Sequence, residues 1–366
     1  MIAKQKSNKT KESLFSSLAT HQHEQVIFCH DEATGLKAII AIHNTTLGPA
    51  MGGVRFWNYS TELAAVNDVL RLSRGMTYKN AIAGLNAGGG KAVIIGEPAK
   101  LKNEVLMRRF GKFIHTLNGN YYTAEDMNMS TTDMEYISME TPFVTGLPEY
   151  MGGAGDPSPY TAYGVYMGIK ASAKRAYGSD SLGGKKILVQ GVGSVGSELV
   201  ALLDREGANI SVADLSDARL KFISQQHNVE VIDTDKVFLT PVDIYSPCAM
   251  GATINDRSIE LLECDIICGG ANNQLQDDTI HDQALVSKGI LYAPDFLVNS
   301  GGITNVYYDY VGNHNRDRVM AQVEKIYETT LKVFTNCDDD MDSPQLAAMK
   351  MADRRIKEIG NLRLTN

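Results

Sequence analysis

The sequence predicts an α/β protein of two domains: an N-terminal α/β domain and a C-terminal Rossmann-type, doubly wound sheet, with a cleft between them. Three observations support this fold class. The chain has 366 residues, which exceeds the ~100–200 residues of a typical domain. Apolar runs of strand length alternate with helical stretches in the C-terminal half. A G-x-G-x-x-G string directly follows the first of these runs.

The N-terminal half mixes short β-rich runs with longer amphipathic stretches. We expect strands at residues 24–28, 37–42 and 91–95, and helices at residues 62–75 and 103–117. This pattern indicates an α+β or α/β arrangement. We assign residues 1–147 to the catalytic and substrate domain.

A glycine- and proline-rich segment separates the two halves. Residues 151–159 contain three glycines and two prolines, which cannot sustain a helix or a central strand. We therefore place a domain boundary near residue 150. Ser158 as the N-cap and Pro159 at the first helical position predict a helix from about residue 160 to 177.

Strands and helices then alternate, as in a parallel sheet covered on both faces. The expected strands lie at 186–190, 209–214, 229–232, 242–245, 265–268 and 289–292, and the first helices between them at 194–206 and 216–227. We assign residues 148–337 to the NAD-binding domain. Helices at 316–334 and 344–359 close the chain, and we interpret the acidic segment 337–342 between them as a solvated loop.

Composition excludes several classes of function. The net charge is −8, and no dense block of Lys and Arg is present, so we expect neither a nucleic-acid partner nor a membrane partner. No run approaches the ~20 apolar residues of a transmembrane helix. The first residues carry Lys4, Lys6, Lys9 and Lys11 without an apolar run, which indicates a polar arm and no signal peptide.

The five cysteines indicate a reduced, cytoplasmic protein, because their number is odd and small for this length. Cys264 and Cys268 have a spacing that a metal pair could use. They lie in an apolar stretch without a nearby His or second Cys pair, which favours a buried strand. We therefore predict no metal site.

The glycine string predicts a dinucleotide site, although glycines also cluster in ordinary turns. Its position between an apolar strand and a helix places unpaired helix N–H groups beside a pyrophosphate. Asp214 ends the next strand, where a carboxylate can bond the ribose hydroxyls and repel a 2′-phosphate. We predict NAD rather than NADP; a helix-capping or turn role for Asp214 stays open. The string comprises Gly191, Val192, Gly193, Ser194, Val195 and Gly196.

Two lysines and an acid suggest chemistry in the N-terminal half. Lys91 follows Gly88-Gly-Gly90, which we interpret as a glycine turn that enters a strand, and Lys79 lies twelve residues earlier among apolar and aromatic neighbours. Asp126 supplies a carboxylate downstream. One lysine can pair with a substrate carboxylate, and a second, desolvated lysine can act as a base. A surface lysine at a strand start is the simpler alternative for Lys91.

At these residues the chain resembles the family of glutamate, leucine, phenylalanine and valine dehydrogenases, and within it most closely the leucine branch. The resemblance extends from about residue 24 to 310, and its matching strings are highly specific when taken together. They lie at residues 47–55, 72–80, 88–96, 123–126, 158–166, 189–193, 243–253, 270–275 and 292–302.

The resemblance implies a reversible oxidative deamination, in which an L-amino acid, NAD+ and water give the 2-oxo acid, ammonium and NADH. It implies that Lys79 holds the substrate α-carboxylate, that Lys91 activates water and that Asp126 handles protons at the amino nitrogen. It adds Gly52 to the substrate site and Thr161 and Asn272 to the cofactor site. The family also implies a homo-oligomer, an octamer for leucine enzymes, and a C-terminal helix, residues 338–366, that packs back on the catalytic domain.

The resemblance also addresses the substrate side chain. Glutamate enzymes of the family carry a lysine and a serine where this chain has Met51 and Val306. A glutamate carboxylate would be buried without a partner there. With Ala124 and Ile303, these residues favour a branched-chain aliphatic substrate, namely leucine and also valine or isoleucine.

Two alternatives stay open. Asn128 and Thr304 depart from the leucine enzymes, and together with the flexible Met51 they could reshape the site for an aromatic substrate such as phenylalanine or tryptophan. A catalytically silent NAD-binding scaffold or regulatory protein is the other alternative. Loss of Lys79, Lys91 or Asp126 would favour it, and all three residues are present.

Overall fold

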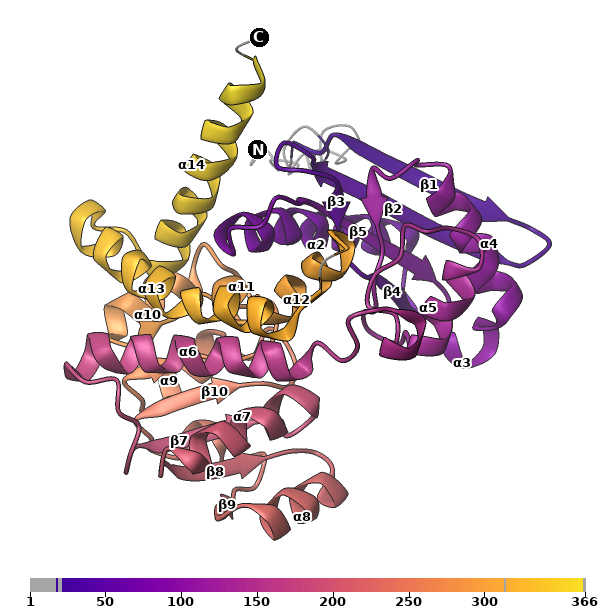
Figure 1. Ribbon diagram of the computed structural model, residues 1–366. Coiled ribbons are helices and arrows are strands. Elements are labelled where there is room, and N and C mark those ends of the chain that lie inside the picture. The colour runs from indigo at the N-terminus through magenta and orange to yellow at the C-terminus, as the bar shows by residue number, and fades with distance from the viewer. Residues whose placement is uncertain (1–17, 19–21, 313, 365–366) are drawn as a thin grey trace, which may run out of the picture. The chain divides into compact units, whose positions relative to one another are not determined.

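The computed structural model describes residues 18, 22–312 and 314–364, so the predicted polar arm lies outside the described residues. The chain forms two compact units that alternate along the sequence (Figure 1). The first comprises the described residues of Met1–Thr45, Pro49–Thr77 and Gly88–Phe143. The second comprises those of Thr46–Gly48, Tyr78–Ala87 and Val144–Asn366. The functional domains expected at 1–147 and 148–337 stay a prediction.

The first unit contains a mixed sheet in the order β1-β2-β5-β3-β6, with β4 also paired to β5. The β1–β2 and β2–β5 pairs are antiparallel, whereas β5 pairs in parallel with β3 and β4. The continuous apolar run of β2 is buried along nearly its whole length, as expected for a central strand. The strands are β1 (Gln25–Asp31), β2 (Leu36–Asn44), β3 (Ala50–Met51), β4 (Val54–Trp57), β5 (Gly88–Ile95) and β6 (Tyr121–Tyr122).

Helix α2 (Glu62–Ile82) packs on this sheet through one apolar face. This face joins buried residues of β2 and β5 in one core. The helix residues are Ala65, Val66, Val69 and Leu70, and the strand residues are Ile39, Ala41 and Val93. Helices α3 (Pro98–Leu101), α4 (Glu104–His115) and α5 (Thr131–Ser138) complete the unit. Ser130 and Asp133 form a capping box that starts α5.

Gly88–Gly90 are strand residues of β5, so the prediction of a glycine turn at this position is wrong. The reason for the glycines is close approach. A Cβ on Gly89 would lie 2.2 Å from the backbone nitrogen of Thr77, and one on Gly90 would lie 2.8 Å from the ring of Tyr121. The missing side chains let α2 and Tyr121 pack directly on the strand that carries Lys91.

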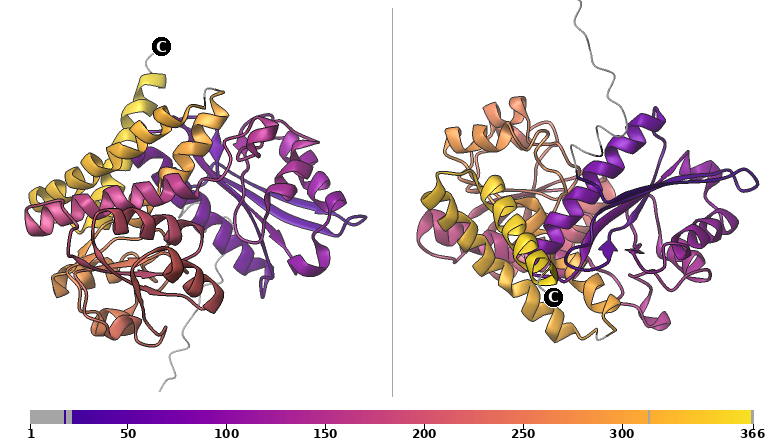
Figure 2. Two further views of the ribbon diagram at one scale, coloured as in Figure 1. Left: turned by 60° about the horizontal axis from the view of Figure 1, so that its bottom comes forward. Right: turned by 90° about the horizontal axis from the view of Figure 1, so that it is seen from above.

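The second unit contains a six-stranded, fully parallel sheet in the order β12-β11-β10-β7-β8-β9 (Figures 1 and 2). Numbered from β7, this is the 3-2-1-4-5-6 order of the Rossmann fold. The predicted fold class is therefore confirmed. The strands are β7 (Lys186–Gln190), β8 (Asn209–Ala213), β9 (Val229–Val231), β10 (Ile244–Pro247), β11 (Ile266–Ile267) and β12 (Leu291–Tyr292).

Alternate side chains of these strands enter two different cores. Ile187 and Val189 join the core that contains residues of α6, α7, α13 and α14, whereas Leu188 joins the one that contains residues of α9 and α10. The sheet is therefore covered on both faces. The helices are α6 (Ser158–Tyr177), α7 (Ser194–Arg205), α8 (Asp217–Gln226), α9 (Asp256–Leu261), α10 (His281–Lys288), α11 (Asp295–Val298), α12 (Gly301–Tyr310), α13 (Arg316–Asp340) and α14 (Pro344–Leu364), with single 3-10 turns η1 (Glu149–Met151) and η2 (Val237–Leu239).

Two further local predictions are wrong. The acidic segment is not wholly a loop, because α13 continues to Asp340 and ends at Met341, which has a left-handed φ of 56°. Ion pairs from Arg175 to Asp338 and from Lys350 to Asp342 offset the acidic charge at this helix end. Ser158 is the first residue of α6 and not its N-cap, which is Pro157.

The C-terminal helix α14 joins the second unit. Its Ala347, Ala348 and Ala352 lie in the core of that unit, and Arg355 donates hydrogen bonds to the carbonyl oxygens of Gly84 (3.2 Å) and Leu85 (2.7 Å). Its expected packing on the catalytic domain stays a prediction. No helix in the described part of the chain has the length and hydropathy needed to cross a membrane.

Candidate functional site

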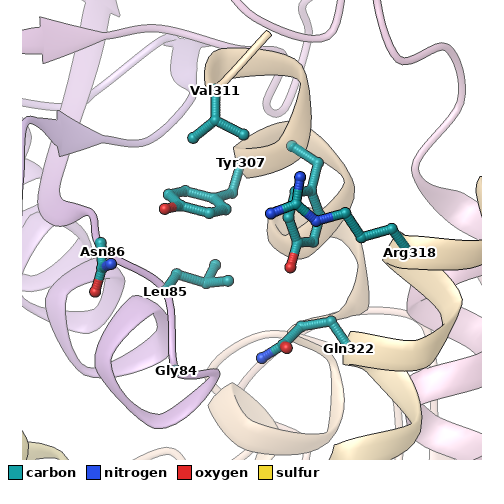
Figure 3. Close-up of a pocket in the computed structure, with 8 residues that line it drawn as sticks. Gly84, Leu85, Asn86, Tyr307, Val311, Arg318 and Gln322 are labelled. Atoms are coloured by element: carbon teal, nitrogen blue, oxygen red, sulfur yellow. The ribbon is translucent and has the colours of Figure 1, made fainter. Parts of the chain in front are cut away.

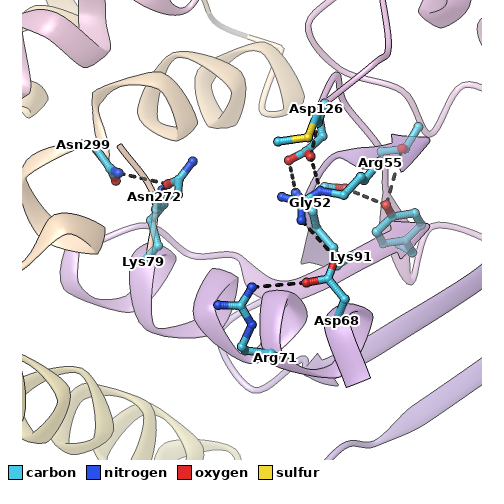
Figure 4. Close-up of polar contacts among 12 residues, drawn as sticks. Gly52, Arg55, Asp68, Arg71, Lys79, Lys91, Asp126, Asn272 and Asn299 are labelled. Atoms are coloured by element: carbon cyan, nitrogen blue, oxygen red, sulfur yellow. Dashed lines mark hydrogen bonds and ion pairs between the residues drawn. The ribbon is translucent and has the colours of Figure 1, made fainter. Parts of the chain in front are cut away.

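Lys91 and Asp126 form an ion pair in the first unit (Figure 4). Lys91 lies within β5 and is 5% exposed, so the simpler alternative of a surface lysine is wrong. Asp126 lies in the loop between β6 and α5. The structure thus brings together two side chains that are 35 residues apart and that were predicted to be catalytic.

Arg55 holds the same carboxylate from β4. Its Nε donates to Asp126 Oδ1 at 2.9 Å, and its Nη1 donates to Asp68 Oδ2 at 3.0 Å (Figure 4). Asp68 also accepts hydrogen bonds from the Tyr59 hydroxyl at 2.7 Å and from Arg71 at 3.2 Å. Each carboxylate accepts hydrogen bonds from more than one side chain, so these side chains restrain one another's geometry.

These cations determine the charge of Asp126. Burial alone would raise the pKa of this carboxyl, but Lys91, Arg55 and the backbone N–H of Met127 together lower it well below its ordinary value. The pKa of Arg55 is raised: burial opposes its charged form, but Asp126 and Asp68 outweigh that effect. Asp126 is therefore ionised at neutral pH.

The predicted substrate residues Met51, Gly52 and Ala124 also belong to the first unit. Met51 ends β3 and is 1% exposed, and the Gly52 carbonyl accepts a hydrogen bond of 2.6 Å from the Tyr121 hydroxyl. The Ala124 carbonyl accepts a hydrogen bond from the Val54 N–H at 2.9 Å. The loop that carries Asp126 is thereby attached to β4.

Asn128, one of the departures from the leucine enzymes, has a backbone role. Its φ is 61°, a region that favours Gly and Asn, and its side-chain amide donates to the Phe56 carbonyl at 3.0 Å. Asn128 therefore stabilises the turn after Asp126. Thr304 likewise bonds within its own helix, donating to the Ser300 carbonyl at 2.9 Å.

Lys79 belongs to the second unit, where its Nζ donates to Asn272 Oδ1 at 2.7 Å. Asn299 donates to the same oxygen at 2.9 Å (Figure 4). Asn299 is 4% exposed, and its own Oδ1 is buried without a hydrogen-bond partner among the described residues. This group offers a cation and an unsatisfied acceptor to a ligand.

The glycine string forms the turn from β7 into α7, and each glycine has a different reason. Gly191 has a φ of 97°. A Cβ on Gly196 would lie 1.9 Å from the Gly191 carbonyl oxygen, so this glycine permits close packing of helix on strand. The space beside Gly193 is open, since only Arg219 Nη1 lies within 4 Å, at 3.9 Å. These residues fit a dinucleotide pyrophosphate at the N-terminus of α7.

Asp214 follows β8 and faces the same turn. Its carboxylate accepts the backbone N–H of Val192 at 2.9 Å and that of Ser216 at 2.8 Å. The turn role and the predicted ribose role are compatible, because each carboxylate oxygen has a second lone pair.

The remaining predicted residues lie on helices of the second unit. Thr161 is in α6 and donates to the Pro157 carbonyl at 3.0 Å, and a Cβ on Gly302 would lie 2.6 Å from its hydroxyl oxygen. Ile303 and Val306 lie on α12, where Val306 is 8% exposed. Among the described residues, no group of three or more His, Cys, Asp or Glu side chains is arranged to hold a metal ion.

Comparison with known proteins identifies the family. Residues 23–143 match the model for the Glu/Leu/Phe/Val dehydrogenase dimerisation domain, and residues 210–361 match the model for Glutamate/Leucine/Phenylalanine/Valine dehydrogenase. The chain belongs to the Glu/Leu/Phe/Val dehydrogenase family.

Relatives in this family match nearly the whole chain. A leucine dehydrogenase from Thermoactinomyces intermedius is 49% identical, with 96% of each chain covered. A valine dehydrogenase from Streptomyces virginiae is 45% identical, with 92% of this chain and 94% of the relative covered. The crystal structure of L-tryptophan dehydrogenase from Nostoc punctiforme has a TM-score of 0.82 at 40% identity, and covers 95% of this chain and 99% of its own. The predicted resemblance to the family is confirmed.

Sequence reasoning assigned no role to three charged residues that the structure places beside these sites, namely Arg55, Asp68 and Arg219. Arg55 stands within a family-like string, which was an available signal. The other two needed the fold, because their partners are brought close by loops and helix packing.

A separate cavity of about 360 Å³ lies in the second unit of this dehydrogenase (Figure 3). Arg318, Tyr307 and Tyr308 line this cavity. The guanidinium carbon of Arg318 lies 4.5 Å from the centre of the Tyr308 ring. The other lining residues are Gly84, Leu85, Asn86, Val311 and Gln322. None of the predicted site residues lines this cavity.

Proposed function

We propose that the chain catalyses the NAD-dependent, reversible oxidative deamination of a branched-chain aliphatic L-amino acid, leucine and also valine or isoleucine, to the 2-oxo acid, ammonium and NADH. The observation that carries this proposal is the buried ion pair of Lys91 and Asp126, held by Arg55, in a family member that is 49% identical to a leucine dehydrogenase. The named relative supports the substrate class, and the ion pair supplies acid and base groups for the reaction.

Lys79 binds the substrate α-carboxylate in this proposal. One of its present partners, Asn272 Oδ1, is a neutral amide oxygen. A carboxylate is a stronger partner for an ammonium group than an amide, so substrate can displace Asn272. The substrate is then oriented by a charged contact at one end.

Lys91 and Asp126 handle the protons. An ionised Asp126 can accept a proton from the substrate ammonium group, but only when its ion pair with Lys91 loosens, because both neighbouring cations favour the carboxylate form. Lys91 is an ammonium group in this ion pair, so it first gives a proton to solvent. As a neutral amine it can then take a proton from the water that attacks the imine carbon. Arg55 stays paired with Asp68 and keeps Asp126 oriented.

When bound, NAD+ accepts the hydride from the substrate Cα. We propose that the turn from Gly191 to Gly196 holds its pyrophosphate and that Asp214 bonds the adenosine ribose, which favours NAD+ over NADP+. Thr161 and Asn272 are proposed as further cofactor contacts by family resemblance. The open space beside Gly193 and the positive φ of Gly191 support the placement of the pyrophosphate at the glycine turn.

Apolar residues select the substrate side chain. We propose that Met51, Ala124, Ile303 and Val306 contact it, with Gly52 beside them. Met51 and Val306 supply no cation, and a glutamate γ-carboxylate would lose its hydration there without an ion-pair partner. Glutamate should therefore be a very poor substrate.

A panel of L-amino acids with NAD+ at alkaline pH, followed by NADH absorbance, tests the proposal. Leucine, isoleucine and valine should have kcat/KM values within about 10- to 100-fold of one another, since an apolar site discriminates a methylene weakly. Phenylalanine or tryptophan above leucine would assign the chain to an aromatic branch, which the similarity to L-tryptophan dehydrogenase makes the second candidate. A glutamate rate equal to that of leucine would contradict the role of Met51 and Val306.

We further propose a homo-oligomer, of eight subunits by family resemblance, which the dimerisation-domain match supports. A cytoplasmic location is proposed from the cysteines. All five are described and none forms a disulfide.

A further inference from the structure

Arg219 is the charged side chain nearest to the open space of the glycine turn. It lies in the first turn of α8, five residues after Asp214, and its side chain is 61% exposed. Its Nη1 lies 3.8 Å from Asp214 Oδ2 and 3.9 Å from the position that a Cβ on Gly193 would take. Arg219 therefore faces both the carboxylate that is proposed to bond the ribose and the turn that is proposed to hold the pyrophosphate.

The surroundings of Asp214 weaken its repulsion of an anion. Its side chain is 8% exposed, and both carboxylate oxygens already accept a backbone N–H, from Val192 and from Ser216. Arg219 adds a full positive charge within 4 Å of the same carboxylate. The Ser216 hydroxyl, the N-cap of α8, is a further polar group beside them.

We propose that Arg219 binds the 2′-phosphate of NADP+, so that this chain accepts NADP+ in addition to NAD+. A guanidinium can bond a phosphate through two parallel N–H groups, and an arginine near the ribose carboxylate is the usual means by which a Rossmann fold accommodates a 2′-phosphate. The proposal rests on the proposed NAD-dependent function and extends it to a second cofactor. Asp214 keeps NAD+ the preferred one.

Cofactor binding without an amino acid tests the proposal, because it does not depend on turnover. Isothermal titrations with NADH and with NADPH compare the wild type, Arg219→Ala and Arg219→Lys. The control is Lys236→Ala, which removes the same charge from a side chain that is 63% exposed. The wild type should bind both cofactors. Arg219→Ala should raise the Kd of NADPH at least about 10-fold, the scale of a charge-assisted hydrogen bond, and the Kd of NADH less than about 3-fold.

Arg219→Lys should retain part of the NADPH affinity, and Lys236→Ala should change neither affinity. Salt should weaken NADPH binding more steeply in the wild type than in Arg219→Ala. Wild-type protein that binds NADH but not NADPH overturns the proposal and leaves the NAD-dependent function intact. An equal loss of both cofactors in Arg219→Ala also overturns it, since the contact would then be to a part that both share. Failure of the wild type to bind either cofactor overturns the proposed function itself.

Discussion

Arg55 decides how Asp126 is held, although it was not among the residues expected to act. It bridges two carboxylates, Asp126 and Asp68, and its side chain is 17% exposed. Removal of the shared cation leaves two negative charges poorly solvated, which is the costly way to break a buried ion pair.

Arg55→Ala should lower the free energy of unfolding by about 3 kcal/mol, the scale for removing one partner of a buried pair. Arg71→Ala is the matched control, because Arg71 contacts the same Asp68 from a side chain that is 57% exposed. Arg71→Ala should lower the free energy of unfolding by only ~0–1 kcal/mol. Urea denaturation of both variants at pH 7 measures the difference. Equal losses of unfolding free energy would contradict the role of Arg55 as the partner of a buried ion pair.

Asp126 should make stability depend on pH in a defined direction. Its folded-state pKa is depressed by Lys91 and Arg55. The stabilisation is therefore complete above the unfolded pKa of ~3.9 and is lost as the pH falls toward the folded value. Asp126→Asn should be less stable than the wild type at pH 7, and the gap should narrow below about pH 4. A gap that stays constant from pH 7 to pH 3 would contradict the depressed pKa.

Lys91→Ala should lower kcat at least ~10²-fold, the usual scale for a general base, while the Kd of NADH changes little. Lys91 pairs only with a residue of the first unit in the described contacts, whereas the glycine turn belongs to the second. Lys100→Ala, which removes an exposed lysine, is the control. Wild-type turnover in a folded Lys91→Ala variant would exclude the role.

At the residue scale, the sequence could predict Lys91, Asp126, the glycines and Asp214, because each stands in a local string with a fixed chemistry. It could not predict the link from Arg55 to Asp126, which are 71 residues apart and meet only through the pairing of β4 with the loop after β6. The positive φ of Asn128 could not be predicted either, because a backbone angle is not visible in a single sequence. Its effect on the choice of substrate stays a prediction.

At the scale of elements, the contact of α2 with β5 depends on missing side chains. Gly89→Ala should destabilise the protein by ~1–3 kcal/mol or more, since the new Cβ would overlap backbone atoms of Thr77 and Ser73. Gly75→Ala in α2 itself is the control. No atom lies within 4 Å of its added Cβ, so it should stabilise the helix by ~0.5–1 kcal/mol. Thermal unfolding of the two variants should move in opposite directions.

Two of the errors at this scale, the glycine turn at residues 88–90 and the acidic loop at residues 337–342, share one cause. Glycines in β5 and aspartates in α13 have poor intrinsic preference for their elements, and packing overrides it. Helix α13 continues into its acidic end because Val333 and Phe334 are buried and Arg175 pairs with Asp338. Such compensation comes from other elements and is invisible to a local pattern.

For the whole molecule, the doubly wound parallel sheet of the second unit could be predicted from alternating strands and helices, because right-handed crossovers leave few arrangements of a parallel sheet. The interleaving of the two units along the chain could not be predicted in this way. Tyr78 packs edge-on against Phe296 at 6.4 Å, and Ala81 and Ile82 enter the second core, so residues 78–87 leave the unit that surrounds them in sequence.

Light scattering should give a particle mass that is a multiple of the chain mass of 40.0 kDa. The match of residues 23–143 to a dimerisation domain supports this expectation. A mass of one chain at micromolar concentration would contradict the proposed homo-oligomer.

Because the two units interleave along the chain, the protein should stay associated after a single proteolytic cleavage near residue 150. Tyr150 is 80% exposed and offers chymotrypsin a site just after the first unit's last residue, Phe143. The N-terminal fragment keeps Leu47, Ala81 and Ile82, whose side chains are buried in the core built mainly by the C-terminal fragment. The nicked chains are therefore held together by a shared hydrophobic interior, and they part only when that interior is dissolved by denaturant.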